Sequence, residues 1–434
     1  MKTIKLGLLG LGTVGGGTLK ILQENADILS QRVPARFEVK RIAVRDLNKP
    51  RTVDTGGIAL TDQPFTVVND PEIDVVVELM GGTTSARELV LSAIDNGKHI
   101  VTANKALLAE HGEEVFAAAE RKGVQVAYEA AVAGGIPIIK ALREGLAANR
   151  IDWLAGIING TGNYILTELK QPGADFATVL KNAQALGYAE ADPTFDVEGI
   201  DAAHKLTILA SLAFGIPLQF DKVYTEGISA ISADDMRFAA MLGYEIKHLG
   251  LAKRTDAGVS LRVHPTLVPK SVLLAQVSGV MNAVMTHGDQ VGPTLYYGPG
   301  AGAGPTASAV VADLVDVART MDCKAHAQVP MLGLGNRQNL TVLGMDEVRC
   351  ACYLRFLAKD VPGVLAKFSG VLAQAGISVE HMHQEPCDDE SGDALVVLIT
   401  DEVTEAAMNR AISKLESLDE IDGAVQRIRI ETLN

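Results

Sequence analysis

The sequence has few cysteines, fewer basic than acidic residues and no long apolar run. Its four cysteines include no CxxC pair, so reduced thiols in a cytosolic protein are the simplest interpretation. The 39 basic residues against 53 acidic ones argue against nucleic acid as a partner, because phosphate binding requires clustered cations. No apolar run is long enough to span a membrane, and the N-terminus has no signal-peptide pattern. We therefore expect a cytoplasmic protein that binds neither a membrane nor nucleic acid.

The apolar content is high enough to form several cores. Hydrophobic residues make up 47% of the 434 residues, which is typical of globular chains and not of disordered ones. We expect two or three domains, each with its own core.

A glycine motif near the N-terminus predicts dinucleotide binding. It follows an apolar strand at 4–9 and precedes a helix with apolar residues at Leu19, Ile21 and Leu22. In a G-x-G-x-x-G turn, the first glycine permits the tight turn and the second lets the backbone approach a pyrophosphate. The third lets the helix pack close to the strand. The predicted cofactor contacts are Gly10, Leu11, Gly12, Thr13, Val14 and Gly15.

The end of the second predicted strand, 38–44, bears on the choice between NAD and NADP. An NAD site places an acidic residue there to bind the ribose 2′-hydroxyl. Here Arg45, which suits a 2′-phosphate, follows the strand, and Asp46 comes next. We expect NADP, and Asp46 leaves NAD open.

The alternation of strands and helices continues and brings a lysine to the carboxyl end of a strand. Strands are predicted at 74–79, 99–101 and 125–128, with a helix at 86–96. The tetrapeptide Thr102-Ala103-Asn104-Lys105 follows the second of these strands, and open α/β sheets bind ligands at that edge. Lys105 can therefore face a nicotinamide and a substrate, although a solvated lysine at a helix start is the alternative.

The stretch 187–205 is the predicted chemical centre. Its acidic residues are Glu190, Asp192, Asp196, Glu198 and Asp201. Asp201 and Lys205 begin a helical pattern that runs to Phe214, and their four-residue spacing puts them on one face. They can act on a small substrate as charge anchor and proton carrier. A surface ion pair is the alternative interpretation.

Beyond this helix, residues 217–300 alternate as strands do. A second glycine-rich loop at 296–304 precedes a helix with apolar residues at Val310, Val311 and Leu314. We expect this helix to return to the first domain. The predicted Rossmann-type nucleotide-binding domain then comprises 1–136 and 305–340, with an α+β substrate and dimerisation domain inserted at 137–304.

The C-terminal region, 349–434, shows the order strand, helix, strand, strand, helix, strand. Strands are predicted at 352–358, 378–384, 395–400 and 425–430. Asp360 and Pro362 suit the start of the first helix, with the proline near its first position. The pattern resembles an ACT domain, a ferredoxin-like βαββαβ unit that often binds amino acids at dimer interfaces. A module that only dimerises the chain is the alternative.

Jointly, the motifs resemble homoserine dehydrogenase over essentially the whole chain. The matching parts are the N-terminal glycine motif, 102–105, 187–205, the loop Tyr297-Gly298-Pro299-Gly300-Ala301-Gly302 and the ACT-like module. The resemblance implies NAD(P)-dependent interconversion of L-aspartate 4-semialdehyde and L-homoserine in threonine, methionine and isoleucine biosynthesis. It also implies L-threonine as an allosteric effector, and we expect a homodimer or homotetramer.

The resemblance further implies roles for individual residues. Lys205 is the proton donor, and the substrate is bound by Glu190, Asp196 and Asp201. The cofactor is contacted by Thr102, Lys105, Gly187 and Gly302. A Na⁺ or K⁺ ion is held by Glu129 and the backbone oxygens of Val132, Gly134 and Ile136. A structural water at that place is the alternative.

The chemistry of aldehyde reduction agrees with these roles. Hydride transfer builds negative charge on the carbonyl oxygen, so a positioned acid must supply a proton. A lysine can do so near neutral pH if desolvation or a neighbouring cation lowers its pKa. Lys105 is such a neighbour and also a rival for the proton-transfer role. Two other functions stay open: a different amino-acid dehydrogenase, and a non-catalytic sensor of nucleotide and amino acid.

Overall fold

The chain forms two compact units, each assembled from three segments. The computed structural model describes residues 2–323, 329–333, 335, 337–387 and 392–433. The first unit comprises Met1–Gly160, Asp201–Val223 and Val280–Leu340, and the second comprises Thr161–Ile200, Tyr224–Gly279 and Thr341–Asn434. The segment 305–340, expected to return to the first domain, includes 324–328, 334 and 336, which lie outside the described residues.

The first unit contains a six-stranded parallel sheet with the order β3-β2-β1-β4-β5-β6. Its strands are β1 (Lys2–Leu9), β2 (Ala35–Ala43), β3 (Ala59–Thr61), β4 (Val75–Glu78), β5 (His99–Thr102) and β6 (Val126–Ala127). β4 and β5 are buried along their whole length, as central strands covered on both faces are. The strand order reverses between β1 and β4, and doubly wound sheets bind nucleotides in the crevice formed there. The predicted Rossmann-type fold is confirmed.

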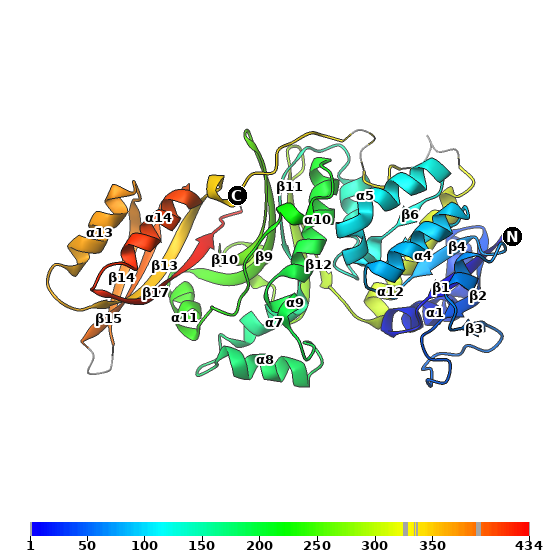
Figure 1. Cartoon of the computed structure of the whole chain (residues 1–434), viewed down its shortest axis with the longest axis horizontal. Coiled ribbons are helices and arrows are strands. Elements are labelled where there is room, and N and C mark those ends of the chain that lie inside the picture. The colour runs from blue at the N-terminus through cyan, green and yellow to red at the C-terminus, as the bar shows by residue number, and fades with distance from the viewer. Residues whose placement is uncertain (1, 324–328, 334, 336, 388–391, 434) are drawn as a thin grey trace. The chain divides into compact units, whose positions relative to one another are not determined.

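Helices cover this sheet. They are α1 (Thr13–Glu24), α2 (Ala26–Arg32), α3 (Phe65–Val68), α4 (Thr84–Asp95), α5 (Lys105–Lys122) and α12 (Ala303–Thr320). α12 lies beside α1 (Figure 1) and adds Val310, Leu314 and Val317 to the core around β1. A Cβ on Gly17 would lie 2.4 Å from the carbonyl oxygen of Ala303. The two helices can therefore approach this closely only with glycine at that position.

The rest of the first unit carries the long helix α10 (Ile200–Phe214), which is buried over most of its length. The preceding elements are η1 (Glu129–Ala131), α6 (Ile138–Lys140), η2 (Ala141–Gly145) and β7 (Ile151–Ile157). α6 widens into the π-helical turn η2 before the chain enters β7. β7 pairs antiparallel with β11 (Met281–Gly288), and β11 pairs with β12 (Gly292–Pro299).

The second unit begins with helices and continues with a long hairpin. Its elements before residue 279 are α7 (Gly160–Glu168), α8 (Phe176–Ala185), α9 (Thr194–Val197), β8 (Tyr224–Thr225), α11 (Ala233–Met241), β9 (Tyr244–Thr255), β10 (Gly258–Pro269) and η4 (Leu273–Gln276). α11 interrupts a region that we expected to consist of strands. It begins with a capping box, in which the Ser232 side chain accepts the Asp235 N–H and the Asp235 carboxylate accepts the Ser232 N–H.

The C-terminal part of the second unit is a βαββαβ module. It contains β13 (Arg349–Lys359), α13 (Val364–Gln374), β14 (Val379–Pro386), β15 (Asp393–Thr400), β16 (Val403–Thr404), α14 (Glu405–Leu415) and β17 (Ile421–Ile430). The strand order is β17-β13-β15-β14, and Figure 1 shows α13 and α14 on one face. This confirms the predicted ferredoxin-like fold. Pro362 was expected near the first position of α13, but it precedes Gly363, the capping residue of that helix.

β17 also links this module to the rest of the second unit. It pairs in parallel with β10, with Arg429 opposite Thr266 and Ile430 opposite Leu267. Within the described part of the chain, no helix is both long and apolar enough to cross a membrane.

Candidate active site

Asp201 lies between two lysine side chains. Its carboxylate accepts a hydrogen bond of 2.6 Å from Nζ of Lys205, one turn later in α10. Nζ of Lys105, at the start of α5, lies 2.9 Å from the other carboxylate oxygen. The side-chain amide of Asn159 donates to Asp201 at 2.8 Å. The structure therefore brings together Lys105, Asp201 and Lys205 and adds Asn159, which sequence reasoning missed.

The cluster is buried around the carboxylate and more open at Lys105. The side chain of Asp201 is 5% exposed and that of Lys205 is 12% exposed, whereas that of Lys105 is 33% exposed. Burial raises the pKa of Asp201, but attraction to Lys205 and Lys105 and the hydrogen bonds from Lys205 and Asn159 outweigh it. The pKa of Asp201 therefore lies well below its ordinary value. Asp201 is therefore an anion at neutral pH.

The ends of neighbouring elements set where the two lysines project. Nζ of Lys205 also donates to the carbonyl of Ile158, just after β7, at 2.7 Å. Asn104 caps α5 by accepting the N–H of Leu107 at 3.1 Å, and its amide donates to the carbonyl of Gly82 at 2.7 Å. Lys105 is therefore the first residue of a helix whose start is fixed by Asn104.

The glycine motif lines a pocket of about 530 Å³ at the carboxyl ends of β1 and β2. Gly10 has a φ of +105°, and a Cβ on Gly15 would lie 2.4 Å from the carbonyl oxygen of Gly10. Both positions therefore require glycine. A Cβ on Gly12 would meet no atom within 4 Å, so the backbone there is open to a pyrophosphate. Thr13 and Val14 form the first turn of α1, as predicted for a phosphate-binding helix start.

Three cations border this pocket beyond the end of β2. They are Arg45, Lys49 and Arg51, and the guanidinium of Arg51 donates to the backbone carbonyl of Asp46. Clustered guanidinium and ammonium groups can bind a phosphate through several charge-assisted hydrogen bonds. Sequence reasoning found Arg45 alone, because Lys49 and Arg51 lie in a loop without a regular pattern.

Glu78, at the end of β4, is a second residue that sequence reasoning missed. It is completely buried, and its carboxylate accepts hydrogen bonds from the N–H groups of Met80 and Gly81 at 2.8 and 3.2 Å. The same carboxylate accepts the Thr102 hydroxyl at 2.7 Å. Glu78 therefore ties the loop after β4, which lines the nucleotide pocket, to the loop that carries Lys105. The one signal in the sequence is a carboxylate within an otherwise apolar strand.

Gly187, Glu190 and Asp196 belong to the second unit. Gly187 has a φ of +75° and follows α8, and Asp196 lies half-buried in α9. Glu190 is exposed, and its backbone carbonyl accepts the amide of Gln184 at 3.0 Å. These contacts place the three residues on one segment between α8 and α10.

Comparison with known proteins identifies the family. Family profiles match residues 10–129 as "Homoserine dehydrogenase, NAD binding domain", 137–315 as "Homoserine dehydrogenase" and 353–418 as "ACT domain". A homoserine dehydrogenase of Pseudomonas aeruginosa is 58% identical over 100% of both chains. The chain belongs to the homoserine dehydrogenase family.

Solved homoserine dehydrogenases share the fold. The crystal structure of the enzyme from Thiobacillus denitrificans is 57% identical, covers 100% of this chain and 99% of that chain, and superimposes with a TM-score of 0.95. A hyperthermophilic archaeal homoserine dehydrogenase in complex with NADPH is 24% identical and shares the fold with a TM-score of 0.62, covering 73% of this chain and 97% of that chain. As a homoserine dehydrogenase, the chain is an NAD(P)-dependent oxidoreductase of amino-acid biosynthesis with a C-terminal ACT domain.

The loop around Glu129 is where this homoserine dehydrogenase was expected to hold a monovalent cation. The Glu129 carboxylate accepts the N–H groups of Ile139 and Lys140, both at 2.9 Å, so it caps α6. Burial raises the pKa of Glu129 to about 7. Among the described residues, no donor bonds the carbonyl oxygens of Val132 and Gly134. These two carbonyls could therefore ligate a cation, and each oxygen of the Glu129 carboxylate accepts one N–H.

The ACT domain of this homoserine dehydrogenase has a pocket of about 360 Å³ beside the start of α13. Asp360, Gly363, Leu365 and Gln384 are among its lining residues, and the Gln384 amide donates to Asp360 at 3.1 Å. Gly363 precedes α13 with a φ of +97° and has no side chain to cap the helix. The N-terminus of α13 can therefore receive the carboxylate of a small amino acid.

Proposed function

We propose that this homoserine dehydrogenase interconverts L-aspartate 4-semialdehyde and L-homoserine with Lys205 as the proton carrier and NADP as the preferred cofactor. The observation that carries the proposal is the buried Asp201 carboxylate, which lies 2.6 Å from Nζ of Lys205 and 2.9 Å from Nζ of Lys105. An anion shared by two amines keeps one of them in place as an acid without leaving a buried charge unpaired.

The proposed reaction divides the work between cofactor and protein. A nicotinamide cofactor, when bound, would supply a hydride to the aldehyde carbon in reduction and accept it in oxidation. In reduction, Lys205 donates a proton to the carbonyl oxygen as negative charge builds on it, and in oxidation its neutral amine takes the proton from the hydroxyl. Asp201 orients the Lys205 amine by a charge-assisted hydrogen bond. The ammonium of Lys105 stabilises the developing charge on the oxygen.

The remaining predicted residues hold the substrate and cofactor in this proposal. Glu190, whose side chain is exposed, pairs with the substrate ammonium, and Asp196 and Asp201 bind the same amino-acid substrate. Gly187 and Gly302 contact the cofactor through their backbones. The role of Gly302 is supported by its position immediately before α12, the helix that packs against α1.

The NADP preference is supported by the three cations at the edge of the nucleotide pocket. Arg45, Lys49 and Arg51 can share a 2′-phosphate, whereas the 2′-hydroxyl of NAD offers them no charge to bind. A Na⁺ or K⁺ ion held by Glu129 and the carbonyl oxygens of Val132, Gly134 and Ile136 would brace the loop that packs on residues 299–300. In the ACT domain, the pocket beside α13 takes L-threonine as effector. We also propose that the enzyme is a cytoplasmic homodimer or homotetramer.

NADPH oxidation with aspartate semialdehyde tests the mechanism in the wild type, Lys205→Ala and Lys105→Ala. We expect Lys205→Ala to lower kcat by about 100- to 10,000-fold with little change in the Kd for NADPH. Near-normal turnover in Lys205→Ala with loss in Lys105→Ala would transfer the proton role to Lys105. If the protein reduces a different amino-acid aldehyde and not aspartate semialdehyde, it is another dehydrogenase. If it binds NADPH but reduces no aldehyde, it is a sensor.

A further inference from the structure

We propose that Arg429 of the ACT domain is a positioning residue for the substrate segment 187–199 and acts on it through Glu226. The inference rests on the proposed assignment of Glu190 and Asp196, which lie on that segment, to the substrate. It connects the last strand of the ACT domain to the binding of homoserine by contacts that all lie within the second unit.

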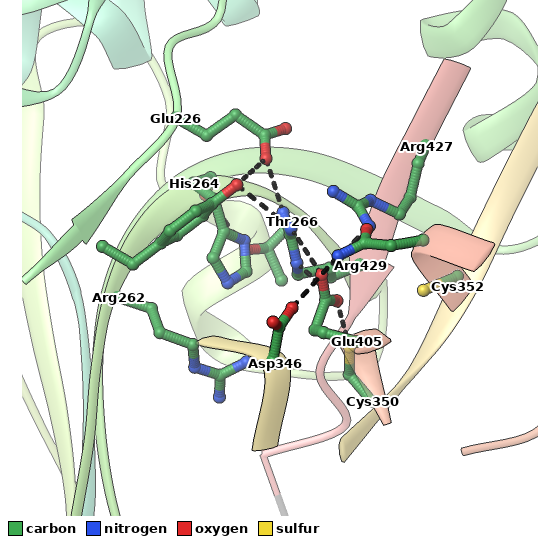
Figure 2. A network of polar contacts seen from close by, with 12 residues as sticks. Glu226, Arg262, His264, Thr266, Asp346, Cys350, Cys352, Glu405, Arg427 and Arg429 are labelled. Carbon is green, nitrogen blue, oxygen red and sulfur yellow. Dashed lines mark hydrogen bonds and ion pairs between the residues drawn. The ribbon is translucent and has the colours of Figure 1, made fainter. Parts of the chain in front are cut away.

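The guanidinium of Arg429 joins two carboxylates from different parts of this unit (Figure 2). Nε and Nη2 donate to the two oxygens of Glu405, the first residue of α14, at 2.8 and 2.9 Å. Nη1 donates to the carboxylate of Glu226, just after β8, at 2.7 Å. The side chain of Arg429 is 0% exposed, and a buried guanidinium is tolerated only when its partners stay in place. The position of Glu226 is therefore tied to the core of the ACT domain.

Glu405 is held on the ACT side by further contacts. Its side chain is 1% exposed, Arg427 lies 3.0 Å from one carboxylate oxygen, and the thiol of Cys350 donates to the other at 3.0 Å. Desolvation raises the pKa of Glu405, but Arg429 and Arg427 outweigh it and the pKa is lowered. Glu405 is thus an anion held in place by its partners. Because Arg429 binds both carboxylates, the position of Glu405 constrains that of Glu226.

On the other side, residues 224–229 pack directly on the end of α9. The N–H of Ile228 donates to the carbonyl of Val197 at 3.0 Å, and the hydroxyl of Ser229 donates to the Glu198 carboxylate at 3.1 Å. A Cβ on Gly227 would lie 2.9 Å from the backbone carbonyl oxygen of Val197. Packing this close leaves no space for residues 224–229 to move independently of residues 197–199.

His248 contacts both Glu226 and Gly199 and so links residues 224–229 to the end of α9. Its Nε2 lies 2.9 Å from the backbone carbonyl of Glu226, and its ring lies against Gly199, where a Cβ would be 3.1 Å from Cε1 of the imidazole. Gly199 has a φ of +84°, so both space and backbone conformation require glycine there. Loss of the Arg429–Glu226 contact therefore displaces the end of α9, which carries Asp196, and with it the segment back to Glu190. The expected consequence is weaker homoserine binding, with the hydride-transfer chemistry unchanged.

A second pair of the same kind provides a matched control. Arg355 in β13 donates to Asp235 in α11 at 2.6 Å, so it also joins an ACT strand to another element of the second unit. This pair makes none of the contacts to residues 197–199 and 224–229 described above. Its loss should destabilise the second unit to a similar degree without moving the substrate segment.

The experiment compares Glu226→Gln, Arg429→Lys and Arg355→Gln in the full-length protein. Glu226→Gln keeps an acceptor for the Tyr224 hydroxyl, which donates to Glu226 at 2.9 Å, and leaves the Arg429–Glu405 pair intact, so we expect it to fold. In Glu226→Gln and Arg429→Lys, we expect KM for homoserine to rise about tenfold, with kcat within about twofold of the wild type. We expect Arg355→Gln to lower Tm comparably and to leave KM unchanged.

Two results would overturn the inference: an unchanged KM in folded Glu226→Gln, or an equal rise of KM in Arg355→Gln. The variant Glu190→Gln separates this inference from the proposed function. If KM rises in Glu190→Gln but not in Glu226→Gln, only the positioning role is wrong. If KM changes in neither variant, the assignment of the segment to the substrate is wrong as well.

Discussion

Nζ of Lys105 lies 2.9 Å from the carboxylate of Asp201, although the two residues lie in the first turns of different helices far apart in the sequence. The same carboxylate lies 2.6 Å from Nζ of Lys205. One buried anion therefore fixes the positions of both amines. Removing that anion should affect catalysis more than it affects cofactor binding, because the nucleotide pocket is lined by other residues.

Asp201→Asn should lower kcat/KM for homoserine by about 100-fold or more, because misplacing a catalytic group by about 1 Å can reduce the rate by that factor. Without the carboxylate, Nζ of Lys205 loses the 2.6 Å hydrogen bond that orients it, so the chemical step should slow while cofactor binding changes little. A kcat/KM within about threefold of the wild type would contradict this role.

Glu78→Gln should raise KM for NADP and lower kcat, each by about tenfold, because misplaced catalytic groups reduce the rate steeply. The amide of glutamine would face the Thr102 hydroxyl, which already accepts the N–H of Asn104 at 3.0 Å. The hydroxyl proton of Thr102 then loses its acceptor, and the two loops that Glu78 joins separate. Glu72→Gln, which changes an exposed carboxylate just before β4, serves as the control. Equal effects in both variants would reject the role.

Arg45→Ala and Arg51→Ala should each lower kcat/KM with NADPH by about tenfold, since each removes a charge-assisted hydrogen bond to the 2′-phosphate. Activity with NADH should stay nearly constant, because NADH lacks that phosphate. Lys20→Ala, which removes an exposed cation of α1, is the control for general effects of charge. An equal fall in kcat/KM with NADPH and with NADH would show that the two arginines contact a part of the cofactor that NAD and NADP share.

L-threonine should inhibit the enzyme by binding beside α13, and Gln384→Ala should abolish the inhibition while activity without threonine is retained. Gln384 holds Asp360 at the mouth of the pocket by a hydrogen bond of 3.1 Å, so its loss should disorder the binding residues. Titration calorimetry with threonine measures the binding directly. Lys367→Ala, in α13, is the control, because Lys367 pairs with Glu420 and does not line the pocket. If the wild-type enzyme binds no threonine, the prediction is wrong. The ACT domain would then bind another ligand or serve only to dimerise the chain.

The second unit should lose stability as the pH falls from 6.5 to 4 because of His248. Burial lowers the pKa of His248 to about 4 in the folded chain. Its Nδ1 has no hydrogen-bond partner among the described residues, so a proton bound there would be buried without an acceptor. The unfolded chain binds a proton near pH 6.5 and the folded chain does so only near pH 4, hence acid favours unfolding.

The size of this effect follows from the difference between the two pKa values. Each unit of pKa corresponds to about 1.4 kcal/mol, so the loss is on the order of 3 kcal/mol across this range. The measurement is the free energy of unfolding against pH for the wild type and His248→Gln, in which the side chain can still donate to Glu226. The difference in the free energy of unfolding between the two proteins should shrink as the pH falls, because only the wild type is destabilised by protonation of a buried imidazole. A constant difference would exclude His248 as the group responsible.

The sequence by itself determined the features that depend on short-range spacing. The glycine motif between a strand and a helix, the pairing of Asp201 with Lys205 one turn later, and the βαββαβ order of the ACT domain follow from local geometry. A helix or a strand repeats at a fixed period, so residues a few positions apart can be assigned to the same face. The family resemblance added the roles that such spacing alone leaves open, such as those of Glu190 and Glu129.

Only the tertiary structure decided which distant side chains meet. Glu78 with Thr102, Lys105 with Asp201, and Arg429 with Glu226 each combine residues from separate elements, and no periodicity relates them. The fold likewise places the N–H groups of Ile139 and Lys140 against the Glu129 carboxylate, a contact that spacing along the chain does not reveal. The physical reason is that a buried charge selects its partners by distance in the packed core, where unpaired polar groups are costly, and packing brings together residues at any separation along the chain.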